Sequence, residues 1–203
     1  MRKLQILSFL LLIIYSCGNT TEQKKNKLIN TDQKLYNEIE KKLSKHNKEL
    51  NCLIEFKRYE NDRLVQDFTE YGALAFTRFE GETATVSGFS GIDNGIGFLL
   101  LVSKDTCIIK HHVLSTNEIF KFNKNEKPTF EIMVPCKKEK ISFCNDVKYI
   151  DGEIISGKIE FESDNYYEII NNKESRVKVE MKAIFKSEPL PIIDGKYKTL
   201  IKK

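Results

Sequence analysis

RVKVEMKAIFK, residues 176 to 186, alternates apolar and charged side chains along most of its length. The apolar members that fall on one side are Val177, Val179, Met181, Ala183 and Phe185. A period of two residues is typical of a β-strand with one buried face and one wet face. The stretch therefore predicts an antiparallel sheet that covers a core with one of its faces.

The same period recurs earlier in the chain. Residues 52–57 and 155–162 alternate in the same way, with Ile54 and Ile159 on their apolar sides. The run from Ile96 to Val102 is instead apolar on both sides. We expect that run in the centre of a sheet, covered on both faces.

Turn residues separate these runs. Asn94-Gly95, Asp151-Gly152 and Asp194-Gly195 suit the positive φ of tight hairpin turns. Many short strands with such turns favour a mainly β fold. The leading prediction is an antiparallel β-sandwich, and an open barrel is the alternative.

One amphipathic helix is expected before the strands, over about residues 32–50. Thr31 or Asp32 offers an N-cap, and Glu38 and Lys42 form an exposed i, i+4 pair. The apolar stripe recurs at spacings of three and four residues and contains Leu35, Ile39, Leu43, His46 and Leu50. Residues 31–203 are enough for a single core, so no second domain is required.

The first 16 residues have the pattern of a secretory signal peptide. Arg2 and Lys3 precede an apolar run from Leu4 to Tyr15, after which the chain turns polar. The run is shorter than the roughly 20 residues that a membrane-spanning helix needs. Residues 17–30 contain little apolar surface and are expected to form a polar tether.

Ile14-Tyr15-Ser16-Cys17 resembles the lipobox of bacterial lipoproteins. The resemblance covers only this first tenth of the chain. It implies that Cys17 is acylated, with palmitate among its acyl groups, and becomes the first residue of a protein anchored on a cell-envelope membrane. Gly18 stands where some lipoproteins carry the aspartate that retains them at the inner membrane, which implies the outer one.

The net charge gives no reason to expect a nucleic-acid partner. The chain has a formal charge of +4, and removal of Arg2 and Lys3 with the signal leaves +2. Charged residues of both signs are plentiful, as on an ordinary solvated surface.

Four cysteines besides Cys17 allow two disulfides in an envelope compartment. They are Cys52, Cys107, Cys136 and Cys144. A local bridge between Cys136 and Cys144, across a turn at residues 137–140, is preferred among the three connectivities. Buried free thiols are the alternative.

No cofactor or metal site is expected. His111 and His112 are adjacent on a predicted strand and point to opposite faces, so they cannot chelate one metal together. Tyr166 and Tyr167 could form an exposed aromatic patch for a protein partner.

These observations favour a non-enzymatic envelope lipoprotein that acts as a binding or structural module. One alternative is an anchored or secreted hydrolase that pairs His111 or His112 with a carboxylate. Another is an immunity-type or inhibitor lipoprotein that blocks an envelope partner through a strand edge or an aromatic patch.

Overall fold

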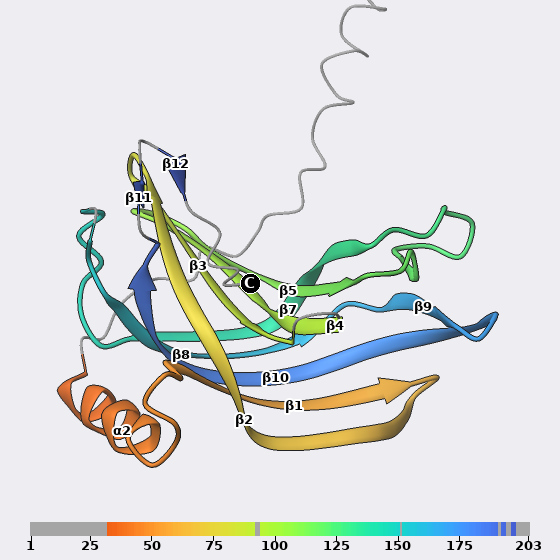
Figure 1. Ribbon diagram of the computed structural model, residues 1–203, viewed down its shortest axis with the longest axis horizontal. Coiled ribbons are helices and arrows are strands. Elements are labelled where there is room, and N and C mark those ends of the chain that lie inside the picture. The colour runs from red at the N-terminus through yellow and green to blue at the C-terminus, as the bar shows by residue number, and fades with distance from the viewer. Residues whose placement is uncertain (1–31, 92–93, 151, 191, 194–195, 198–203) are drawn as a thin grey trace, which may run out of the picture.

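The computed structural model describes residues 32–91, 94–150, 152–190, 192–193 and 196–197. Its elements, shown in Figure 1, are α2 (Gln33–Leu43), β1 (Cys52–Glu60), β2 (Arg63–Glu80), β3 (Thr83–Ser90), β4 (Asn94–Ser103), β5 (Cys107–Ser115), β6 (Phe120–Lys121), β7 (Glu131–Phe143), β8 (Ile155–Ser163), β9 (Tyr166–Ile170), β10 (Lys173–Pro189), β11 (Ile192–Ile193) and β12 (Lys196–Tyr197). The prediction of a mainly β fold with one N-terminal helix is confirmed for the described part of the chain.

Ten strands form one sheet in the order β1-β2-β3-β4-β5-β7-β8-β10-β9-β6, with antiparallel neighbours. β10 also pairs with β1 along its middle, from Cys52 opposite Phe185 to Glu60 opposite Val177. This pairing closes the sheet into a barrel-like ring, which is not evenly round. Two sides of the ring face each other across the core, and Figure 1 shows β1, β8 and β10 crossing below β3, β4 and β5.

Long strands carry the sheet from one side of the ring to the other. The first part of β7 pairs with β5, and its second part pairs with β8. Between the two parts the register shifts from Lys137 to Lys140, and Lys138 has a φ of +53°. The turn expected at residues 137–140 is therefore wrong: these residues form a β-bulge, which bends a continuous strand.

Most of the buried apolar side chains form one cluster inside the ring. The predicted alternation is confirmed on β10, where Val177, Val179 and Phe185 are fully buried. β4 lies between β3 and β5, as expected for a central strand, and buries Phe98 and Leu100 completely.

Helix α2 packs on the outside of the ring, mainly against β8 and β10. Leu35, Ile39 and Leu43 pack there in a small second cluster with Leu53 and Ile184. Asp32 is the N-cap and accepts a hydrogen bond from the Lys34 backbone N–H, as predicted.

The helix ends at Leu43, so its predicted extension to Leu50 is wrong. His46 and Leu50 instead lie in turns, where the Leu50 N–H donates to the Asn47 carbonyl. The expected Glu38–Lys42 pair is present at 3.9 Å. Within the described residues, no helix has the length and apolar character needed to span a bilayer.

Two of the expected turns can be compared with the structure. The Asn94-Gly95 turn is wrong, because both residues belong to β4 and a Cβ on Gly95 would lie 1.9 Å from the Phe89 ring. Gly152 does occupy a turn, with a φ of +90°. Asp151, Asp194 and Gly195 lie outside the described residues.

Candidate functional site

The ring is open along the first half of β2. Residues 63–73 pair with β1, whereas β3 pairs only with residues 74–80. Glu70, with a φ of +55°, lies in the register irregularity just before the strand changes partners. The lumen is therefore accessible between β2 and the beginning of β4.

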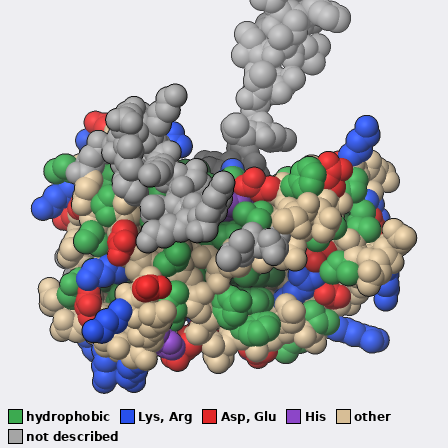
Figure 2. Space-filling model, in the orientation of Figure 1, with side chains coloured by type: hydrophobic (Ala, Val, Ile, Leu, Met, Phe, Trp, Pro, Cys, Tyr) green, Lys and Arg blue, Asp and Glu red, His purple; other side chains and the backbone are tan. Residues whose placement is uncertain are grey.

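A cavity of about 620 Å³ occupies this opening. Ligand pockets in proteins commonly have volumes of roughly 300–1,000 Å³ and mostly apolar walls. The wall here combines apolar and uncharged polar residues with two charged ones: Phe56, Arg58, Gln66, Asn94, Gly95, Ile96, Val113, Leu114, Ser115, Asn117, Ile119, Phe120, Tyr166, Glu168, Ile169, Ile170 and Asn171. Figure 2 shows hydrophobic side chains gathered on this face, between the first half of β2 and the beginning of β4.

Aromatic rings extend the apolar wall towards the edge of β2. Phe56 stacks on Phe68 with a centroid separation of 5.0 Å, and Tyr71 meets both rings edge-on. Phe68 and Tyr71 are about two-fifths exposed despite their contact with a buried phenylalanine. Phe56 lines the cavity, and Phe68 and Tyr71 add exposed aromatic surface next to it.

A network of charged groups lies at the inner end of the cavity. Arg58 donates to Glu168 through Nη1 at 2.9 Å and Nη2 at 2.6 Å. It also donates to Oε1 of Glu60, through Nε at 3.1 Å and Nη2 at 2.8 Å. Tyr166 Oη donates to Glu168 Oε1 at 3.3 Å. Three ionisable side chains from β1 and β9 are thus fixed by hydrogen bonds around Arg58.

Burial and neighbouring carboxylates act in opposite directions on the pKa of Arg58 and in the same direction on that of Tyr166. Desolvation disfavours the Arg58 cation, but the adjacent Glu168 and Glu60 carboxylates raise its pKa above the ordinary value. Burial, reinforced by the Glu168 carboxylate, raises the pKa of Tyr166 well above its usual range. Arg58 is therefore charged, and Tyr166 is neutral and available as a donor.

His111 lies in the core beside this network and is fully buried. Its ring packs 5.8 Å from Tyr166 and 6.2 Å from Phe161. Burial lowers the pKa of His111 to about 4, so the imidazole is neutral at pH 7. Nδ1 donates to the Gly97 carbonyl at 3.1 Å, and Nε2 has no hydrogen-bond partner among the described residues.

His112 points to the outer face of the sheet, so the prediction that the two histidines face opposite ways is confirmed. Its Nε2 lies 2.5 Å from Glu131 Oε1. Neither histidine is among the residues that line the cavity. In the described ranges, no group of three or more histidine, cysteine, aspartate or glutamate side chains could hold a metal ion.

The expected aromatic patch at Tyr166 and Tyr167 is wrong for Tyr166. The alternation of β9 turns Tyr166 into the core with no exposed surface, and Glu168 follows on the same face. Tyr167 lies on the other face, half-buried, with Lys124 Nζ 5.9 Å from its ring centroid.

The four cysteines after Cys17 are all free thiols, so the structure does not contain the expected disulfides. The preferred local bridge is absent because Cys136 contacts the core inside the ring, whereas Cys144 packs in the helix cluster outside it. Cys52 and Cys107 are buried. Burial raises the thiol pKa of Cys107 to about 12 and that of Cys144 to about 11.

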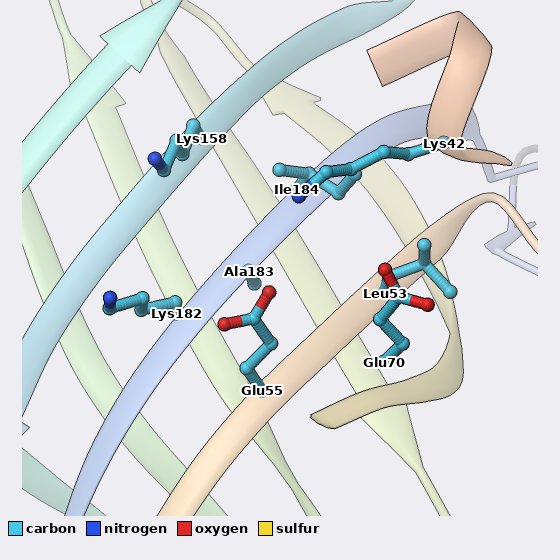
Figure 3. Close-up of a pocket in the computed structure, with 8 residues that line it drawn as sticks. All are labelled: Lys42, Leu53, Glu55, Glu70, Lys158, Lys182, Ala183 and Ile184. Atoms are coloured by element: carbon cyan, nitrogen blue, oxygen red, sulfur yellow. The ribbon is translucent and has the colours of Figure 1, made fainter. Parts of the chain in front are cut away.

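A second recess, of about 230 Å³, lies beneath the last turn of α2. Figure 3 shows Lys42 reaching across it from the helix, with Lys158 and Lys182 on the side opposite Glu70. Its mixed charges and small volume make it a weaker candidate for a ligand than the cavity at the ring opening.

Arg58 and Glu168 were missed by the sequence analysis, although a signal for them exists. Arg58 continues the inward series of Ile54 and Phe56, and Glu168 continues that of Tyr166. A charged residue at an inward position of an alternating strand is a marker for a buried polar site.

Comparison of the chain with family models, with curated proteins and with solved structures gives no match. Cys17, the signal segment and the tether lie outside the described residues.

Proposed function

We propose that this chain is a lipid-anchored protein of the bacterial cell envelope, held on its membrane by an acylated Cys17, and that its ring binds a small amphipathic molecule.

 The observation that carries the proposal is the 620 Å³ cavity at the ring opening, whose apolar wall ends at hydrogen-bonded charged groups. A pocket of this size, with a few convergent polar groups, is the common form of a small-molecule site.

A binding role fits the chemistry of the wall better than a hydrolytic one. A general acid–base pair needs an imidazole or a carboxyl group with a proton to exchange in reach of the substrate. Glu168 is held by Arg58 and Tyr166, and neither histidine of β5 lines the cavity. We therefore favour a binding module over the hydrolase alternative.

The cavity can be tested with N-phenyl-1-naphthylamine, an uncharged probe whose fluorescence rises in apolar surroundings. Ile96 and Leu99 are both half-buried on β4 and face opposite sides of the sheet. We expect Ile96→Trp to fill the cavity and weaken probe binding at least tenfold, while Leu99→Trp leaves it unchanged. Equal binding by both variants and the wild type would exclude the cavity as the site.

The anchor is tested separately, by intact mass and membrane fractionation of the full chain expressed in bacteria beside its Cys17→Ser variant. We expect the wild type to carry acyl groups and sediment with membranes, and the variant to lose both properties. A soluble, unacylated wild type would contradict the anchor and leave the cavity proposal standing.

A further inference from the structure

The charged groups around Arg58 are unequal in number. Of the described residues that line the cavity, Arg58 and Glu168 are the charged ones, and Glu60, which is outside the lining, is a second carboxylate in direct contact with Arg58. One guanidinium thus faces two carboxylates, which leaves a formal charge of −1. Glu168 is almost completely buried, and Glu60 is one-third exposed.

Arg58 has little capacity left for a ligand anion. Its Nε, Nη1 and Nη2 all donate to Glu60 or Glu168. The carboxylates retain acceptor capacity, because each oxygen can accept about two hydrogen bonds. Both bonds from Arg58 to Glu60 end on Oε1, and Glu168 Oε2 accepts from Nη2. The inner wall therefore offers acceptors and negative charge to whatever enters.

We propose that the ligand is an amphipathic cation with an ammonium head group and an apolar chain. This inference rests on the proposed function and names its ligand class. The ammonium lies against the Glu168 carboxylate, and the chain lies along Phe56 and Ile96. The Glu60 carboxylate, in contact with Arg58, adds to the negative charge there. A carboxylate head group in the same place would be repelled by the excess charge at short range and low dielectric, which excludes fatty acids as the preferred class.

The test is displacement of N-phenyl-1-naphthylamine by three compounds with one chain and different heads: dodecylammonium, dodecanol and dodecanoate, each below its micelle concentration at pH 7. We expect dodecylammonium to displace the probe at a concentration at least tenfold lower than dodecanoate, with dodecanol between them. The chain's net positive charge, +4 before and +2 after removal of Arg2 and Lys3 with the signal, would favour the anion, so such an order cannot come from non-specific attraction.

Two variants test whether Glu60 and Glu168 cause the preference for dodecylammonium over dodecanoate. Glu60→Gln and Glu168→Gln each remove one negative charge, and we expect each to bring the displacement concentrations of the ammonium and the carboxylate to within about threefold of each other. Glu60 is partly exposed, so its variant keeps the test available if Glu168→Gln does not fold. Glu131→Gln makes the same charge change on the outer face and should keep the wild-type order.

Each outcome has a distinct meaning. Equal displacement by the three compounds, or tighter binding of dodecanoate, would overturn the cationic ligand while leaving the cavity as a binding site. Unchanged selectivity in Glu60→Gln and in a folded Glu168→Gln would also overturn it. A wild-type protein that does not bind the probe would contradict the proposed function instead.

Discussion

The buried imidazole of His111 should make the stability of this protein depend on pH. The ring has no exposed surface, and its pKa in the folded state is about 4, compared with an ordinary value of 6.5. Below pH 6.5 the unfolded chain binds a proton that the folded protein does not, so the free energy of unfolding falls as the pH decreases from 6.5 towards 4. The full difference corresponds to about 3 kcal/mol, of which about 2 kcal/mol is lost by pH 5.

His111→Phe isolates this contribution. Phenylalanine keeps a ring beside Phe161 and Tyr166, loses the hydrogen bond to the Gly97 carbonyl and removes the unpartnered Nε2. Urea unfolding of wild type and variant, measured at pH 7.5 and at pH 5, gives the loss of stability for each.

We expect the loss to be smaller in His111→Phe than in the wild type by about 2 kcal/mol. Carboxylates that titrate in the same range contribute to both proteins and cancel in the difference. His112→Gln, a change of the neighbouring histidine on the outer face, should keep the wild-type loss. Equal losses in His111→Phe and the wild type would show that His111 is not buried as a neutral group.

Three further predictions follow from the packing. Arg58→Met leaves Glu168 buried without its cation and should lower the free energy of unfolding by about 3–5 kcal/mol in urea denaturation. A loss below 1 kcal/mol would contradict the buried network. Gly97→Ala places a Cβ 2.0 Å from the Gly88 carbonyl oxygen and should lower the free energy of unfolding by about 1–3 kcal/mol or more. A Cβ on Gly81 meets nothing within 4 Å, so Gly81→Ala should lower it only by the strain of the positive φ, about 1–2 kcal/mol. The four cysteines after Cys17, of which Cys136 is partly buried and the others are buried, should resist iodoacetamide at pH 8 in the folded Cys17→Ser protein and all react in denaturant. Early labelling, or thiols missing after denaturation without reductant, would contradict free thiols protected by the fold.

The fold class could be predicted because alternation is a local property of the sequence. The period of residues 176–186 fixes which side chains of β10 face the core, and the structure buries Val177 and Phe185 as that period requires. The path of the strands could not be predicted in the same way. The bulge at Lys138 and the bend near Glu70 depend on which neighbour each half of a strand pairs with, and that choice is made by contacts distant in sequence.

The candidate site was harder to predict than the fold because its residues are distant in sequence. Arg58 and Glu168 are 110 residues apart and meet because β9 and β1 both pair with β10. The glycines at positions 95 and 97 show the same limit, because the sequence predicts a turn at Asn94-Gly95, a pair that commonly forms one. In the structure they give space to the Phe89 ring against β4, a packing role that only the neighbouring strand reveals.

The register shifts in the first half of β2 affect both the opening of the ring and the behaviour of this half as an edge strand. A strand with unpaired backbone groups and exposed apolar side chains, such as Leu64 and Val65, is prone to pair with other chains. Here the register with β1 shifts twice along residues 63–71, between Arg58 and Tyr59 and between Ile54 and Phe56. Such bulges twist an edge and interrupt the even row of donors and acceptors that another strand would need. The same shifts also turn this part of β2 away from β3, which keeps the cavity accessible. The irregular edge is therefore better suited to admitting a small molecule between β2 and β4 than to adding a strand from a protein partner.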